Sequence, residues 1–243
     1  MQDANILQRV RRVLTILAIF ALGAIAHGSG LLPEMLSYWR DIVYLGRQHL
    51  WLVAMSGGLA VGVGVPLGVF LTRPWMRKFA ESTIQVVNLG QTIPTLAVLA
   101  LSMSVLGIGT VPAVFALWLY TLLPIVRNTY QGILSVSPAT LEAARGMGMT
   151  NGQILWRVEL PNALYVMIAG IRTALVINVG TVPLAFLIGG GGLGQLIFTG
   201  IDLFNTGMLL AGAVPTALLA VAVDFALGLI AFYFVPRGVN PLR

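Results

Sequence analysis

Long apolar stretches dominate the chain, and the polar and charged residues gather in short segments between them. A helix that crosses a bilayer needs about 20 mostly apolar residues. Six stretches meet this requirement: residues 13–32, 50–71, 83–106, 110–126, 164–188 and 207–235. None of them alternates apolar and polar positions as membrane β-barrel strands do. Because only helices and closed barrels satisfy the backbone in lipid, the pattern predicts an all-α membrane protein with about six spanning helices.

The composition favours the same class. Apolar residues make up 58% of the 243 residues and charged residues 9%, whereas a soluble surface needs roughly 25–35% charged residues. This balance argues against a soluble enzyme, a disordered chain and a nucleic-acid binder, and it makes the lipid bilayer a partner. The chain has no cysteine, and its two histidines, His27 and His49, are isolated, so we expect no disulfide and no metal site.

The basic residues predict the orientation of the spans. With the N-terminus in the cytoplasm, Arg40 and Arg47 lie outside and Arg172 lies within a span. All the other basic residues then lie inside, as expected for cytoplasmic loops, which carry an excess of Lys and Arg. This inside set comprises Arg9, Arg11, Arg12, Arg73, Arg77, Lys78, Arg127, Arg145, Arg157, Arg237 and Arg243.

The first apolar stretch has two interpretations. Residues 1–26 fit either a retained span or a cleaved signal peptide, because arginines precede an apolar run that ends in small residues. Residues 33–49 are rich in aromatic and charged side chains, and we expect them to lie along the outer interface. The predicted regions are an N-terminal span with this interfacial segment (1–49), a transmembrane domain (50–235) and a cytoplasmic tail (236–243).

The longest segment between spans, residues 127–163, predicts a helix–turn–helix on the cytoplasmic side. Gly148 is a favourable end for the first helix, and Thr150 with Gln153 forms a capping box for a second short one. Pro161 is expected to break the chain before the next span. The residues alone leave two possibilities open: a hairpin that rests on lipid, or a docking element for another protein.

The spacing within this loop resembles the EAA motif of binding-protein-dependent ABC importer permeases. Glu-Ala-Ala is followed after three residues by Gly148, and after nine more by Val158-x-Leu-Pro, with Val158 where the family usually has Ile. In that family the short helix of the loop seats in a groove of the ATPase and transmits its closure to the spans. The resemblance assigns ATPase coupling to Glu142, Ala143, Ala144, Gly148, Leu160 and Pro161.

Further segments resemble the glycine betaine and choline branch of that family, over roughly residues 50–235; they are residues 90–97, 122–130, 142–149, 169–173 and 188–194. The resemblance implies a type I importer fold in the bacterial inner membrane. It also implies as partners two ATP-binding cassette subunits, a second permease subunit that is identical or related, and an external solute-binding protein. The chain has no phosphate-binding loop of its own, so we expect it to be neither an enzyme nor a holder of a cofactor.

Polar residues and glycines within or next to the spans predict where a solute passes. Polar side chains and a proline on two spans suit a path for a zwitterion, although each polar residue is equally suited to hydrogen bonding between helices. These pathway candidates are Gln91, Thr92, Pro94, Asn178 and Thr181. A four-glycine run after the fifth span is the expected outer gate, with a flexible outer turn as the alternative; it comprises Gly189, Gly190, Gly191 and Gly192.

Two charges fall inside predicted spans. Arg172 and Asp224 lie at similar depths from the inner ends of the last two spans. Because an unpaired charge in a bilayer is costly, we expect the two to form an intramembrane pair. Alternatively, Arg172 extends to the inner headgroups, and Asp224 lies nearer a helix end than the span limits suggest.

The sequence predicts a permease subunit of an ATP-driven importer for a small quaternary-amine solute such as glycine betaine or choline. Two other functions stay open: a permease for another small solute such as an amino acid, and a stand-alone channel or carrier not driven by ATP. The sequence does not identify the solute, nor does it distinguish a homodimer from a heterodimer of permeases.

Overall fold

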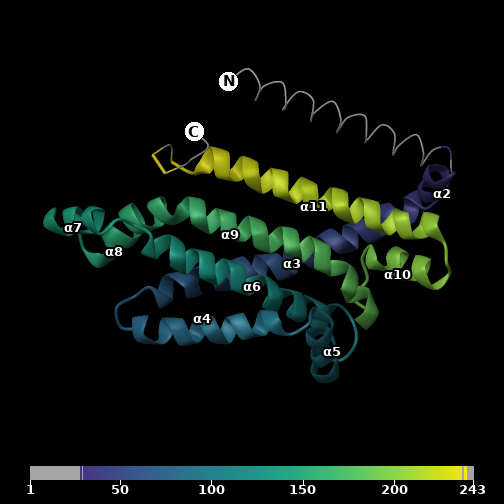
Figure 1. Ribbon diagram of the computed structural model, residues 1–243, viewed down its shortest axis with the longest axis horizontal. Coiled ribbons are helices and arrows are strands. Elements are labelled where there is room, and N and C mark those ends of the chain that lie inside the picture. The colour runs from purple at the N-terminus through teal and green to yellow at the C-terminus, as the bar shows by residue number, and fades with distance from the viewer. Residues whose placement is uncertain (1–27, 29, 237, 240–243) are drawn as a thin grey trace, which may run out of the picture.

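The computed structural model describes residues 28, 30–236 and 238–239, and this part of the chain is helical throughout, without strands. Four long helices run side by side along the molecule (Figure 1). They are α3 (Trp39–Leu71), α6 (Thr110–Leu134), α9 (Leu160–Thr181) and α11 (Thr206–Phe234). Each is long and apolar enough to cross a membrane, alone or with the helical turns that continue it. The predicted all-α membrane fold is therefore confirmed.

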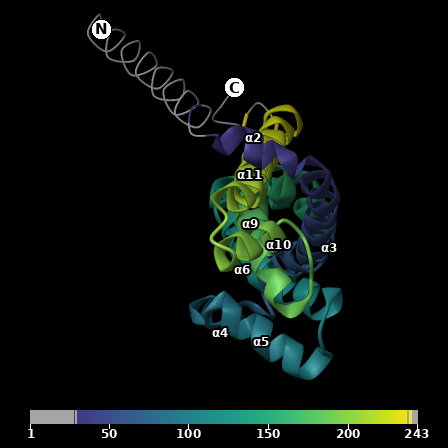
Figure 2. The same cartoon turned by 90° about the vertical axis from the view of Figure 1, so that its right-hand side faces the viewer.

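Shorter helices close the two ends of this bundle. One end, which we call the hairpin end, carries α7 (Pro138–Gly146), α8 (Asn151–Ile154) and the π turn η1 (Leu155–Glu159). The other end, the glycine end, carries α2 (Leu31–Ser37), the 3₁₀ turn η2 (Val182–Ile188), residues 189–192 and α10 (Gly194–Asp202). The remaining pair, α4 (Arg77–Thr92) and α5 (Thr95–Leu106), lies to one side of the bundle (Figure 2).

Within the described residues the sequence predicts five spans, and the structure has four or five. Four helices meet the length and hydropathy requirement, and the bent pair α4–α5 makes a fifth if it is one span. The predicted first span, residues 13–32, and its signal-peptide alternative lie almost wholly outside the described residues, as does most of the tail 236–243.

The helix that contains the second predicted span begins before that span. α3 has 33 residues and starts at Trp39, so residues 39–49 are helical and continuous with the predicted span, and the predicted boundary at residue 50 falls inside a helix. Gly46 is the one residue between Trp39 and Leu50 that could interrupt the helix, and the helix continues through it. A Cβ atom placed on Gly46 would have no neighbouring atom within 4 Å. At 1.5 Å per residue α3 is about 50 Å long, so it extends well beyond a hydrocarbon core of about 30 Å.

The predicted third span, residues 83–106, is not one straight helix. α4 and α5 meet at 91° across Ile93 and Pro94. Pro94 lacks an N–H and forces the preceding residue out of the helical region, and Ile93 accordingly has an extended backbone (ψ 128°). The sequence predicts a kink at Pro94, and the observed bend, close to a right angle, is larger than such a kink. α5 by itself is only about 18 Å long.

Glycines allow α3, α6 and α9 to pack closely against one another. A Cβ atom placed on Gly68 of α3 would lie 2.6 Å from the Cβ of Thr129 on α6, and one on Gly64 would lie 2.9 Å from Ile125. Gly57 of α3 faces Leu175 and Asn178 of α9 in the same way. Between α6 and α9, Gly132 of α6 faces Ala163, and Gly170 of α9 faces Asn128. The three helices therefore form a closely packed three-helix unit.

The distribution of charge along the bundle fits the predicted orientation. Arg73, Lys78, Arg145 and Arg157 belong to the hairpin end, where Arg73 and Arg145 line opposite sides of a cavity between the α3–α4 corner and α7. Arg40 and Arg47 lie in the first turns of α3, which pack near the glycine end. The positive-inside rule then places the hairpin end in the cytoplasm.

The glycine contacts predict a matched pair of variants. Gly68→Ala should lower the unfolding temperature of the detergent-solubilised protein by several degrees, because overpacking a tight contact costs about 1–3 kcal/mol. Gly62→Ala is the control, since Gly62 is exposed on the same helix with no atom within 4 Å of a placed Cβ. Equal unfolding temperatures for the two variants would contradict the described packing of α3 on α6.

Candidate functional site

The cytoplasmic loop folds into the predicted hairpin. α7 begins with Pro138 at its first position and ends before Gly148, whose φ of +77° lies in the left-handed region that favours glycine. The capping box of α8 is present: the Gln153 amide N–H donates to Thr150 Oγ1 (3.4 Å), and the Thr150 N–H donates to Gln153 Oε1 (2.9 Å). These local signals fix the turn between α7 and α8.

The residues to which the motif assigns ATPase coupling lie in two places, on the hairpin and at the start of α9. Glu142, Ala143 and Gly148 are exposed on the hairpin, available to a partner, whereas Ala144 is 1% exposed and holds α7 against the rest of the chain. Leu160 and Pro161 are half-buried in the first turn of α9. They line an apolar groove of about 820 Å³ together with Trp156 and residues of α3, and so lie apart from the hairpin turn.

Pro161 does not break the chain as the sequence predicts. α8, η1, α9 and η2 form one continuous apolar run, Asn151–Ile188. The π turn inserts an extra residue just before the proline, and the Leu160 N–H bonds to the Leu155 carbonyl across it. The Asn162 side chain donates to the Val158 carbonyl (2.7 Å), which satisfies that acceptor. The turn thus accommodates the ring and missing N–H of Pro161, and the hairpin is joined directly to α9.

A small cavity of about 190 Å³ lies between α6 and α9, and two of the predicted pathway residues, Asn178 and Thr181, line it. Tyr120 also lines it and donates a hydrogen bond from its hydroxyl to the Ile93 carbonyl at the α4–α5 bend. Pro94 and Thr92 lie at that bend and are exposed, and the side chain of Gln91 is outside the described part of the structure. The sequence did not single out Tyr120, which links the bend to the cavity.

Asn178 is also a contact between helices. It is 1% exposed, and its amide donates to Ser56 Oγ on α3 (2.8 Å), which in turn donates to the Leu52 carbonyl (2.7 Å). Thr181 Oγ1 donates to the Asn178 carbonyl (3.0 Å). Asn178 therefore makes a hydrogen bond between helices, the alternative that the sequence left open, whereas the Thr181 bond stays within α9.

The four glycines form a tightly packed turn. Gly189, Gly191 and Gly192 have φ near +80°, and Gly190 and Gly192 are buried. A Cβ on Gly190 would lie 2.8 Å from the Cβ of Ala113, and one on Gly189 would lie 2.8 Å from Ile108. Close packing on α6 and on the residues before it leaves little room for a flexible loop.

Two neighbouring residues of α3, to which sequence reasoning gave no role here, lie against this turn: Gln48 bonds to it, and His49 packs against Gly192. Gln48 Oε1 accepts from the Gly192 N–H (3.2 Å). His49 is fully buried, and its Nε2 lies 3.1 Å from the Val179 carbonyl of α9. The sequence signal was weak, because both residues precede the predicted start of the span. No group of three His, Asp or Glu side chains that could hold a metal occurs among the described residues.

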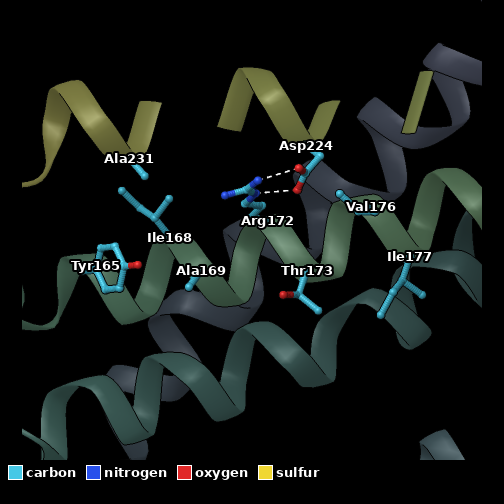
Figure 3. A pocket seen from close by; sticks show the side chains of 9 residues that line it. All are labelled: Tyr165, Ile168, Ala169, Arg172, Thr173, Val176, Ile177, Asp224 and Ala231. Atoms are coloured by element: carbon cyan, nitrogen blue, oxygen red, sulfur yellow. Dashed lines mark hydrogen bonds and ion pairs between the residues drawn. The ribbon is translucent and has the colours of Figure 1, made fainter. Parts of the chain in front are cut away.

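Arg172 and Asp224 lie next to each other on α9 and α11. Arg172 Nε and Nη2 donate to the two carboxylate oxygens of Asp224, each at 2.5 Å, and the side chains are 39% and 43% exposed. They border a cavity of about 400 Å³ that Tyr165, Thr173 and apolar residues also line (Figure 3). The bidentate geometry is the strongest that an arginine and a carboxylate form, and here it joins the last two long helices.

A double-mutant comparison tests whether this pair holds α9 and α11 in register. Arg172→Leu and Asp224→Leu should each lower the yield of folded protein several-fold, because each leaves one uncompensated charge in a span. The double variant should recover part of the loss, as measured by size-exclusion chromatography in detergent. Strictly additive losses would mean that the two charges act independently.

Comparisons with known proteins identify the family. Residues 64–238 match the family described as "Binding-protein-dependent transport system inner membrane component". The osmoprotectant import permease protein OsmY of Salmonella typhimurium is 50% identical over 217 residues, which are 88% of this chain and 92% of that protein. The glycine betaine/carnitine/choline transport system permease protein OpuCB of Bacillus subtilis is 41% identical over 203 residues, which are 84% and 93% of the two chains.

Solved structures agree with the family. An inward-facing structure of the MetNI methionine ABC transporter has a TM-score of 0.72 at 26% identity and covers 81% of this chain and 96% of its own. A crystal structure of an amino acid ABC transporter with histidines has a TM-score of 0.67 at 19% identity, with coverage of 81% and 95%, and indicates the fold alone. The fold is thus that of type I ABC importers, and the relatives are transport permeases, not enzymes. This chain belongs to the family of inner membrane components of binding-protein-dependent transport systems, and it is a multi-pass permease subunit of an ABC importer.

Proposed function

We propose that this permease moves a small quaternary-amine osmoprotectant, such as glycine betaine or choline, inward across the membrane, and that separate partner subunits hydrolyse the ATP. The complete importer contains two ATP-binding cassette subunits, a second permease subunit and an external solute-binding protein. The transport unit is the predicted domain 50–235, extended toward the N-terminus by the first turns of α3.

The observation that carries the coupling role is the hairpin itself. Glu142, Ala143 and Gly148 are exposed at the basic, cytoplasmic end, and the hairpin continues into α9 without a break. A stand-alone channel or carrier gives this exposed element no role. Ala144, Leu160 and Pro161 act differently in this proposal: they hold the hairpin and the start of α9 in place.

The solute passes between α6 and α9 and the α4–α5 bend. Gln91, Thr92, Pro94, Asn178 and Thr181 belong to this path, and the cavity beside Tyr120 supports it. The glycine turn at residues 189–192 closes the outer end, supported by its contact with Gln48. The solute class rests on relatives that are named for osmoprotectants, glycine betaine, carnitine and choline.

An amino acid is the second candidate solute. Its support is the likeness to a methionine transporter, at 26% identity. The identity to the osmoprotectant permease from Salmonella, 50%, is nearly twice that to the methionine transporter, 26%, and so favours the quaternary amine.

Uptake of radiolabelled glycine betaine, choline and carnitine tests the proposal, in cells that lack other importers and express this permease with its ATPase and binding protein. Wild-type cells should accumulate at least one of these solutes, and excess unlabelled methionine or histidine should not compete. Gly148→Leu should reduce uptake several-fold and weaken co-purification of the ATPase, because a side chain at a φ of +77° distorts the hairpin.

Gly58→Leu is the matched control, since Gly58 is exposed on α3 with no atom within 4 Å of a placed Cβ. It should transport normally. Uptake that persists without the ATPase would contradict the proposal, and competition by methionine would transfer the assignment to an amino acid.

A further inference from the structure

At the hairpin end, an ion pair joins the residues that follow α3 to the π turn that precedes α9. Arg73 Nη2 donates to Glu159 Oε2 at 2.6 Å, and the two side chains are only 22% and 14% exposed. Arg73 follows the end of α3, and Glu159 is the last residue of the π turn before α9. The pair therefore connects α3 to the segment through which the hairpin continues into the membrane.

Further hydrogen bonds fix Arg73 in this position. Its Nε and Nη2 donate to Thr72 Oγ1 at 3.1 and 2.7 Å, and its Nε also approaches the Val69 carbonyl (3.3 Å). Val69 lies in the last turn of α3 and Thr72 caps the helix, and a positive charge is favourable at this C-terminal end. These bonds hold the guanidinium at the end of α3, in a position from which Nη2 also donates to Glu159.

The rest of this end of the molecule is more open. A cavity of about 800 Å³ separates the α3–α4 corner from α7 and α8, with Trp75 on one side and Glu142 and Arg145 on the other. Because of this space, packing alone gives the hairpin little hold on the corner. The ion pair lies at the border of the cavity and bridges the two sides through charged side chains.

We propose that the Arg73–Glu159 pair is a coupling strut: it makes the cytoplasmic end of α3 follow the hairpin when the ATPase moves it. This inference rests on the proposed function and deepens it. Without the strut, the hairpin would still dock to the ATPase and still pull on α9 and the helices packed on it. The corner at Arg73, beyond the last glycine contact of α3 at Gly68, would lag behind. The two residues are positioning residues that contact neither ATP nor solute.

Charge reversal with rescue tests the strut in the complete transporter, reconstituted in liposomes with its ATPase and binding protein. Arg73→Glu and Glu159→Arg should each reduce solute uptake per ATP hydrolysed by about tenfold, within the range typical of coupling between two sites. ATPase co-purification should remain normal. The double reversal should restore most of the uptake, because it rebuilds the pair with opposite polarity. Lys78→Glu, an equal charge change at an exposed residue of the same corner, should have no effect.

A covalent cross-link between the two positions provides a second test if a single charge-reversal variant does not fold. The chain has no cysteine, so Arg73→Cys with Glu159→Cys provides two unique thiols. Joining them with a short bis-methanethiosulfonate should restore uptake in the folded double variant, and a reductant should abolish it again.

The outcomes separate the strut from the function on which it rests. Normal uptake per ATP in both single reversals, no rescue by the double reversal in folded protein, or an inactive cross-linked transporter would each overturn the strut. A wild-type complex without ATP-driven uptake would overturn the proposed function itself, and the strut with it.

Discussion

Close approach among α3, α6 and α9 is the constraint on which the rest of the structure depends. Lipid tails are as apolar as leucine, so helices in a bilayer gain little from burying apolar side chains against one another, and association depends on tight packing. Glycines supply it on all three contacts: Gly64 and Gly68 toward α6, Gly57 toward α9, and Gly132 and Gly170 between α6 and α9. The hairpin end and the glycine end are both attached to this unit.

Polar contacts then fix the register of the helices. The Ser56–Asn178 hydrogen bond joins α3 to α9, and such bonds between membrane helices average only about 0.6 kcal/mol. An unpaired charge in a span is much more costly, so Arg172 and Asp224 restrict the position of α11 more than any single hydrogen bond does. α11 needs this restriction, because its most apolar window is only 6% buried in the chain.

Local signals predicted local structure well. The turn at Gly148 and the capping box of Thr150 and Gln153 depend on neighbours within a few residues, and both are present. The start of α3 was placed too late, because hydropathy marks where lipid begins and not where a helix begins. Pro161 was expected to break the chain, and the π turn that accommodates it has no recognised sequence pattern. Gln48, His49 and Arg73 acquire partners more than 80 residues away, which spacing along the chain does not indicate.

The central claim is that the hairpin and the three-helix unit move as one body. Spin labels at Met147→Cys on the hairpin and Tyr44→Cys near the glycine end of α3 test it, since both side chains are exposed and the chain has no other cysteine. Double electron–electron resonance should be recorded with one labelled copy per transporter, without nucleotide and with ATP trapped. The account predicts the same distance distribution in both states. A clear shift of the distance between the two labels within one copy would contradict it.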